Sequence, residues 1–210
     1  MASICGKLII VTGGSTSSGK TTLVNYLLNE FPKFSRIITY TTRPPREGEI
    51  QEKDYYFLTR FKFQEQIQSG QILEWFEYAD NLYGTGKQEI EKVLNGKNKI
   101  WVIHPVTAAD IRNVLKHWLN NEDIEKILKN TLIIYLDVED EEVIKERLKE
   151  RGYTEEIIKE RTNQTKKDRL AVIDKFEHII INKEGKLGDT LLEGKKLVES
   201  FLRGYTNTNG

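Results

Sequence analysis

Short apolar runs alternate with amphipathic stretches along most of this 210-residue chain. Four runs with the length and composition of buried strands lie at 7–12, 99–104, 131–136 and 178–181, and residues 35–40 are a candidate fifth. Strands that alternate with helical patterns favour a parallel sheet covered by helices. The predicted fold class is therefore α/β, with a parallel core sheet flanked by helices.

Helical periodicity is clear in three of the intervening segments. Apolar residues recur on one face at 107–119, 140–150 and 189–203. The second of these segments starts with Asp140 and Glu141, and acidic side chains in a first turn interact favourably with the helix dipole. We expect all three segments to be helices that pack on the sheet.

Two segments interrupt this alternation. Residues 41–97 contain Pro44 and Pro45, many aromatic residues, short strand signals and one helical stretch near 60–69, which predicts an inserted small mixed or antiparallel lobe. Residues 150–168 are charged and have little to bury, which predicts a mobile helical lid. The expected division of this single domain is a core of 1–40, 98–149 and 175–204, a lobe of 41–97, a lid of 150–174 and a polar tail of 205–210.

A glycine-rich motif follows the first apolar run. Residues 14–21 read Gly-Ser-Thr-Ser-Ser-Gly-Lys-Thr, the pattern G-x-x-x-x-G-K-[ST] of a phosphate-binding loop between a strand and a helix. Loop N–H groups and the helix N-terminus attract anions, while Lys20 would reach the β- and γ-phosphates and Thr21 would ligate Mg²⁺. The alternative is an ordinary Gly/Ser turn before a helix. The residues expected to bind ATP are Gly14, Ser15, Thr16, Ser17, Ser18, Gly19, Lys20, Thr21 and Thr22.

Composition narrows the class of protein. Lys plus Arg and Asp plus Glu number 32 each, so there is no global basic field for nucleic acid or a membrane surface. The single Cys5 excludes an intramolecular disulfide framework and is typical of a reducing compartment. The chain starts with no secretory signal pattern, and no apolar run approaches the ~20 residues needed to span a bilayer. We expect a soluble, cytoplasmic protein that binds small molecules.

Further motifs follow the phosphate loop in a fixed order. Residues 39–49 read Thr-Tyr-Thr-Thr-Arg-Pro-Pro-Arg-Glu-Gly-Glu, and Asp-Tyr-Tyr-Phe at 54–57, Leu-Glu-Trp at 73–75 and Tyr-Gly-Thr at 83–85 come after them. In this order and at these spacings the chain resembles the guanylate kinase family from about residue 7 to residue 203. The resemblance implies a P-loop kinase that moves the γ-phosphate of ATP to GMP or dGMP, with Mg²⁺ as cofactor. It also implies a monomer or homodimer whose partners are ATP and GMP.

Four residues of the inserted lobe are candidates for binding the acceptor phosphate. Arg43 and Arg46 stand three apart in a proline-stiffened loop, and arginines grip phosphates with two parallel hydrogen bonds. Tyr55 and Tyr83 carry hydroxyl donors on apolar rings. The residues alone leave open a solvated arginine pair and core aromatics. The resemblance assigns all four to the phosphate of GMP.

Glu74 is the candidate for reading guanine. It lies between Leu73 and Trp75 in an apolar segment, where an unpaired carboxylate is costly. A carboxylate can accept hydrogen bonds from N1–H and N2–H₂ of guanine, and by resemblance Glu74 does so while Thr39 and Thr85 bring hydroxyls to the base. A surface glutamate on a strand edge is the alternative.

The resemblance also supplies arginines from the lid. Arg151 and Arg161 match the positions that close over the ATP phosphates and the transferring group, so the expected catalytic residues are Lys20, Arg43, Arg151 and Arg161. Phosphoryl transfer depends mainly on such positioning and charge neutralisation. Arg147 is a weaker candidate, and Asn182 falls where the family contacts adenine or is simply a turn residue at a strand end.

The chain departs from the family at the end of the run at 99–104. The family has an acid-x-acid pair there, and this chain has Val102 and His104. One acid normally helps to hold the Mg²⁺ shell, and the other supports guanine and the acceptor arginine. His104 is included among the expected GMP-site residues, where it would donate to the base; the alternative is a satisfied histidine at a strand end. The connection before 131–136 is also longer than usual, with a turn expected at 120–123.

Two other functions stay open at this point. The lost acids and His104 are compatible with a related enzyme whose acceptor is another nucleotide or a ribose bisphosphate. A non-catalytic module that binds a phosphorylated peptide in the acceptor pocket is the second alternative. The intact phosphate loop, with Lys20 and Thr21, counts against that module.

Overall fold

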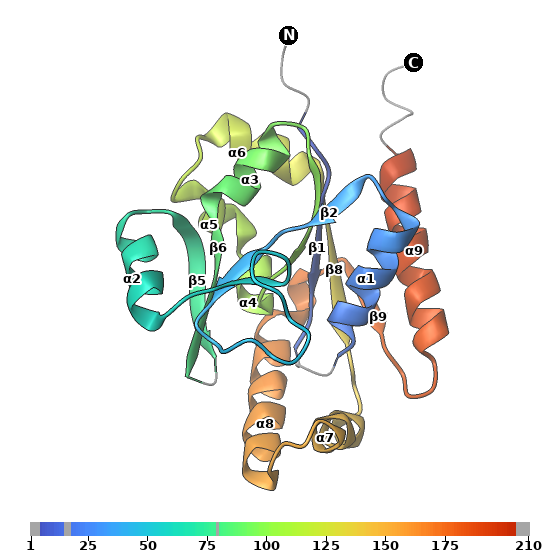
Figure 1. Ribbon diagram of the computed structural model, residues 1–210. Coiled ribbons are helices and arrows are strands. Elements are labelled where there is room, and N and C mark those ends of the chain that lie inside the picture. The colour runs from blue at the N-terminus through green and yellow to red at the C-terminus, as the bar shows by residue number, and fades with distance from the viewer. Residues whose placement is uncertain (1–4, 15–17, 79, 205–210) are drawn as a thin grey trace. The chain divides into compact units, whose positions relative to one another are not determined.

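The computed structural model describes residues 5–14, 18–78 and 80–204 (Figure 1). Within these residues the chain divides into two compact units. Unit 1 takes its described residues from the ranges 1–8, 36–99 and 111–130, and unit 2 from 9–35, 100–110 and 131–210. Among the described residues, no helix is long and apolar enough to cross a membrane.

A five-stranded parallel sheet confirms the α/β prediction, with strand order β2-β7-β1-β8-β9. Every residue of the central strand β1 is buried, as in a parallel strand covered on both faces. β8 and β9 pair in parallel from Ile134 opposite His178 to Asp137 opposite Ile181. The strands are β1 (Leu8–Thr12), β2 (Phe34–Arg36), β7 (Asn98–Val102), β8 (Thr131–Asp137) and β9 (His178–Ile181).

Two helices of unit 2 pack side by side against this sheet, α1 (Lys20–Glu30) and α9 (Leu187–Arg203) (Figure 1). Their buried faces meet strand residues in one apolar cluster that includes Leu23 and Leu27 of α1 and Val198 of α9. Burial of such side chains is the main favourable contribution to folding. This cluster holds the start of α1, and therefore the phosphate loop, in place.

The residues predicted as a lid, 150–174, are mostly helical, and they follow a helix of the predicted core. α7 (Glu141–Glu150) and α8 (Glu155–Val172) pack on each other through an apolar cluster of Val138, Ile144, Leu148 and Ile158. A short 3₁₀ turn, η1 (Ile173–Lys175), follows α8. In the turn between the helices Gly152 has φ +77°, a left-handed conformation that favours glycine. α4 (Pro105–Ala109) also packs against α8.

Unit 1 contains a mixed four-stranded sheet of order β4-β3-β6-β5. β3 pairs with β4 in parallel and with β6 antiparallel, and the β5–β6 pairing is antiparallel with an irregularity between Ile72 and Glu74. Tyr40, Phe63, Ile72 and Leu82 form its core. The strands are β3 (Thr39–Thr41), β4 (Tyr55–Phe57), β5 (Ile72–Tyr78) and β6 (Asn81–Gly86), and the helices are α2 (Arg60–Gln68), α3 (Lys87–Leu94), α5 (Ile111–Lys116) and α6 (Asn121–Lys129).

Three elements differ from the expectations. The periodic segment 107–119 is two helices, α4 and α5, which separate at Asp110. The turn expected at 120–123 is instead the start of α6, because the Asn120 side chain accepts a hydrogen bond from the Asp123 N–H as a helix cap. Residues 35–40 contribute to two strands, β2 and β3, which lie in different sheets.

Candidate active site

The phosphate loop joins β1 to α1 as its motif predicts. Gly19 precedes α1 with φ +95°, and a Cβ there would lie 2.8 Å from the Asn182 amide nitrogen, so the position requires glycine. Thr21 and Thr22 are exposed in the first turn of α1, where N–H groups face a bound anion. Ser15, Thr16 and Ser17 lie outside the described residues.

Lys20 is folded back onto its own loop. Its Nζ donates to the Gly13 carbonyl at 3.0 Å and to the Ser18 hydroxyl at 3.1 Å. Burial and, to a smaller extent, the positive charge of Arg151 lower the pKa of Lys20 to about 8. A polyanion in the loop would offset this penalty, because an opposite charge favours the protonated amine.

Asn182 lies behind the loop and is buried. Its Nδ2 donates to the Ser18 carbonyl at 2.9 Å, and its Oδ1 accepts from the Thr190 hydroxyl at 3.3 Å. These bonds connect the loop to β9 and α9. A cavity of about 180 Å³ beside Asn182 has apolar walls of Val138, Val143 and Ile181, which suit the flat face of a base. The expected contact between Asn182 and adenine stays a prediction.

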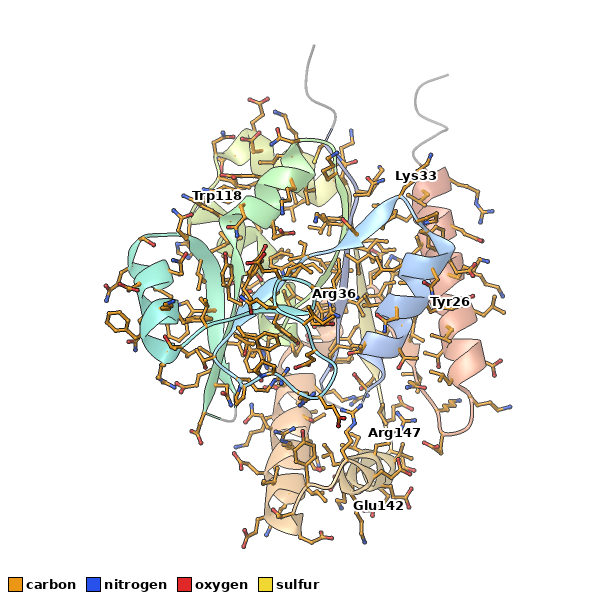
Figure 2. All side chains as sticks on the ribbon, in the orientation of Figure 1. Tyr26, Lys33, Arg36, Trp118, Glu142 and Arg147 are labelled. Carbon is orange, nitrogen blue, oxygen red and sulfur yellow. The ribbon has the colours of Figure 1, made fainter. Side chains whose placement is uncertain are left out.

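The lid arginines belong to the same unit as the loop. Arg151 caps the C-terminal end of α7 and is exposed, and its charge acts on Lys20. Arg161 of α8 lies over the Tyr153 ring, 4.1 Å from the centroid, a cation–π contact. Arg147 extends from α7 (Figure 2) and pairs with Glu184 at 2.9 Å. Arg147 is therefore engaged in an exposed ion pair.

His104 caps α4 and has a partner on the lid helix. Its Nε2 lies 3.2 Å from Asp168 Oδ2, while its Nδ1 accepts from the Val106 N–H at 3.4 Å. Val102 ends β7. His104 belongs to unit 2 with the loop, whereas the other predicted GMP-site residues belong to unit 1.

Arg43 is held by a carboxylate that the motif analysis did not single out. Its guanidinium binds both carboxylate oxygens of Glu49, at 2.8 and 2.9 Å, and donates to the Pro44 carbonyl. Glu49 also accepts from the Arg46 N–H at 2.7 Å, so one carboxylate orders the whole 43–49 loop. These hydrogen bonds hold the pKa of Glu49 below its usual value against the effect of burial.

The two predicted tyrosines flank Arg43. Its guanidinium carbon lies 5.5 Å from the Tyr55 ring centroid, and Arg36 lies 6.0 Å from the same ring (Arg36 is labelled in Figure 2). Tyr83 meets Tyr55 edge to face, with centroids 6.5 Å apart. Burial raises the pKa of Tyr83 and Arg43 opposes that rise, so the phenol stays protonated as a donor. Cations and hydroxyl donors therefore gather within unit 1.

Glu74 and Thr85 form a buried pair on neighbouring strands. Thr85 of β6 stands opposite Glu74 of β5, and its hydroxyl donates to Glu74 Oε1 at 2.7 Å. Thr85 is fully buried and Glu74 is 9% exposed. Thr39 begins β3, opposite Tyr55. A fixed, buried carboxylate is suited to accept hydrogen bonds from a base.

Comparison with known proteins identifies the family. The guanylate kinase family model matches residues 5–200. A guanylate kinase of Prochlorococcus marinus is 37% identical over 195 residues, which cover 92% of this chain and 97% of that protein. One from Synechocystis is 35% identical over 182 residues, with 86% and 87% covered. The chain belongs to the guanylate kinase family.

A solved structure agrees at the level of the fold. The crystal structure of guanylate kinase from Anaplasma phagocytophilum aligns with a TM-score of 0.65 at 20% identity, and covers 98% of this chain and 89% of that chain. Membership of this family makes the protein a nucleoside monophosphate kinase.

Four polar residues near the predicted ATP-site and GMP-site residues were not predicted from the sequence. Glu49 and Arg36 lie in unit 1, and Asp168 and Tyr135 in unit 2. Tyr135 is fully buried with its hydroxyl beside Gly14, and burial and Asp137 raise its pKa to about 12. Glu49 stood inside the recognised motif, so a search for a carboxylate near the paired arginines would have found it. The other three become visible only when strands and helices meet.

Proposed function

We propose that this chain transfers the terminal phosphoryl group of ATP to GMP or dGMP. The observation that carries this proposal is the buried Glu74–Thr85 pair, present together with the full phosphate-loop motif in the sequence of a guanylate kinase family member. Neither alternative acceptor nor the binding module has an observation in its favour.

The donor side works by charge and position. Loop N–H groups and the start of α1 bind the ATP phosphates, and Lys20 exchanges the Gly13 carbonyl for phosphate oxygens. Arg151 and Arg161 then neutralise charge that develops on the transferring group, the main requirement of this reaction. The cavity beside Asn182 takes the adenine base.

The acceptor side presents a dianionic phosphate to Arg43 and Arg46. Glu49 keeps Arg43 in one conformation before GMP binds, which lowers the entropy cost of forming two hydrogen bonds to phosphate. Tyr55 and Tyr83 donate hydroxyl hydrogen bonds to the same group. Glu74 accepts from guanine N1–H and N2–H₂, and Thr39 and Thr85 bring hydroxyls to the base.

Mg²⁺ is the proposed cofactor and arrives with ATP. Among the described residues no three His, Cys, Asp or Glu side chains gather in a way that would hold a metal ion. The exposed Thr21 hydroxyl at the start of α1 suits an ion held mostly by phosphates and water. The metal neutralises charge on the phosphates when it is bound. Cytoplasmic location and a monomeric or homodimeric state remain predictions.

A coupled ADP-release assay across GMP, dGMP, AMP, CMP, UMP and a ribose phosphate tests this function. We expect GMP and dGMP to stimulate ADP release in a Mg²⁺-dependent way. Lys20→Ala should lower the rate by about 10²-fold or more, because a preorganised cation is lost. Folded protein that releases no ADP with any acceptor would overturn the enzyme assignment. Preference for another acceptor would support the related-enzyme alternative.

A further inference from the structure

The C-terminal half of the lid helix α8 lies directly against the phosphate loop. A Cβ added to Gly14, the first glycine of the loop motif, would lie 2.9 Å from Thr165 Cγ2 and 3.4 Å from the Tyr135 hydroxyl. Thr165 is buried, and its hydroxyl donates back to the Arg161 carbonyl at 2.8 Å. Gly14 and this half of α8 therefore pack without space for a side chain between them.

Asp168 holds this half of the helix in place. The residue is only 7% exposed, and a buried carboxylate is unfavourable unless its oxygens are hydrogen-bonded. Gln164 Nε2 donates to its Oδ1 at 2.8 Å, and His104 Nε2 lies 3.2 Å from its Oδ2. The bond to His104 crosses from α8 to the junction of β7 and α4, two elements that carry no part of the lid.

The bonds of His104 define its tautomer. Its Nδ1 accepts from the Val106 N–H, so a proton is available for Asp168 on Nε2, which lies 3.2 Å from Asp168 Oδ2. The ring thus caps α4 with one nitrogen and binds α8 with the other. An acid at position 104 would cap α4 equally well but would repel Asp168.

The rotation of α8 about its axis decides where Arg161 points. Arg161, Thr165 and Asp168 are spaced four and then three residues apart in one uninterrupted 18-residue helix, so they share a face. Asp168 lies seven positions after Arg161, which is about 10 Å along the helix axis. Holding Asp168 in place therefore also fixes the direction in which the Arg161 side chain leaves the helix.

We propose that the hydrogen bond between His104 and Asp168 anchors the lid helix, and that both are positioning residues that orient Arg161 for phosphoryl transfer. This inference rests on the proposed role of Arg161 in transfer. The contact with Asp168 keeps the C-terminal end of α8 beside Gly14 of the loop.

Hydrogen exchange of the nucleotide-free protein tests the anchor without activity. His104→Ala and Asp168→Ala should each increase exchange in peptides from 162–172, with β1 and β8 unchanged. The double variant should add nothing beyond the larger single effect, because both changes break one bond. The control is Lys167→Ala, an exposed side chain of the same helix, which should not alter exchange. Unchanged exchange in the single variants, or fully additive effects, would overturn the proposal.

Steady-state kinetics of the His104 and Asp168 variants separates an effect on kcat from an effect on the KM for GMP, which a purely structural role would not do. Each alanine variant should lower kcat by about 10- to 100-fold with the KM for GMP within a factor of two, because misplacement of an orienting group costs rates of this order. A raised KM for GMP with an unchanged kcat would instead place His104 at the acceptor and overturn the anchor. If the unaltered chain itself lacks GMP kinase activity, the proposed function fails, and the exchange experiment still tests the anchor.

A rescue pair covers the case in which an alanine variant fails to fold. His104→Asp alone keeps an acceptor for the α4 cap but places two carboxylates together, so it should loosen α8 and lower kcat. Adding Asp168→Asn supplies an amide donor to the new carboxylate, and should restore both exchange protection and kcat to within about threefold. Failure of the second substitution to restore either quantity would overturn the proposal.

Discussion

Several proposed site residues are already hydrogen-bonded to other protein groups before any nucleotide binds, each donor to an acceptor. Lys20 rests on a loop carbonyl, Arg43 on Glu49 and Glu74 on Thr85. Such partners lower the entropy lost when a substrate binds, because each group already occupies a narrow range of conformations. Substitutions at this scale should therefore affect affinity and base choice more than folding.

The protonation of Lys20 gives the first prediction. Burial lowers its pKa to about 8, so part of the amine is neutral at pH 8 in the free protein. Bound ATP favours the charged form and raises this pKa, so binding should take up protons at pH 8 and almost none at pH 6.5. Calorimetry in two buffers of different ionisation enthalpy measures the uptake. Lys20→Arg keeps the charge without titrating, and should abolish it; uptake that persists in this variant would assign it to another group.

Base choice gives the second prediction. Glu74→Gln keeps the shape but replaces one acceptor with a donor, which leaves a guanine donor unpaired at a cost of about 1–3 kcal/mol. We expect kcat/KM for GMP to fall at least ~10-fold while that for AMP changes little or rises. Glu77→Gln, an exposed glutamate on the same strand that pairs with Arg60, is the matched control. Equal losses for GMP and AMP would show that Glu74 is structural.

At the scale of elements, polar contacts join helices to strands at buried positions. Asn182 connects β9 to the phosphate loop, and His104 connects β7 to α8. In unit 1 the fully buried Glu89 of α3 pairs with the buried Lys99 of β7, Nζ to Oε2 at 3.1 Å. Such pairs specify how elements meet, but a single broken partner leaves a buried charge.

The Glu89–Lys99 pair therefore gives a stability prediction. Lys99→Met leaves the Glu89 carboxylate with the half-exposed Lys92 as its remaining cation, and should lower the free energy of unfolding by about 3 kcal/mol. Glu89→Leu combined with Lys99→Met removes both charges and should cost much less. Urea denaturation measures both, with Lys92→Ala as the control expected to cost under ~1 kcal/mol. A double variant no more stable than Lys99→Met alone would contradict this reasoning.

For the whole molecule, the arginines are divided between the two units. Arg43 and Arg46 lie in unit 1, and Arg151 and Arg161 in unit 2. The proposed transfer brings all four to one phosphoryl group from which water is excluded. The proposed function therefore predicts that the two units close around the bound nucleotides.

Closure gives the fourth prediction. A bisubstrate dinucleotide that joins adenosine and guanosine through phosphates should lower the radius of gyration in solution scattering, whereas ATP alone should produce a smaller change. The dinucleotide should not compact Lys20→Ala, which lacks the donor-side cation. Scattering curves of the unaltered chain that coincide with and without the dinucleotide would rule out closure.

Much of the candidate site could be predicted because its chemistry is local in sequence. The phosphate loop needs a strand, Gly14, Gly19, Lys20 and a helix start in immediate succession, and the structure has that order. The principal strands were predicted from their apolar runs to within a residue or two. Helix α6 was missed because Asn120 is equally common in turns, and only its bond to Asp123 identifies it as a cap.

The sequence by itself determined the α/β class, the phosphate loop and the set of arginines and aromatics that mark the guanylate kinase family, because these depend on short-range pattern and spacing. Only the tertiary structure decided which side chain faces which. His104 meets Asp168, 64 residues away, and Asn182 meets Ser18, 164 residues away. Such pairs leave no periodic signal, since the energy of a buried polar contact depends on a partner that only folding brings within hydrogen-bond distance.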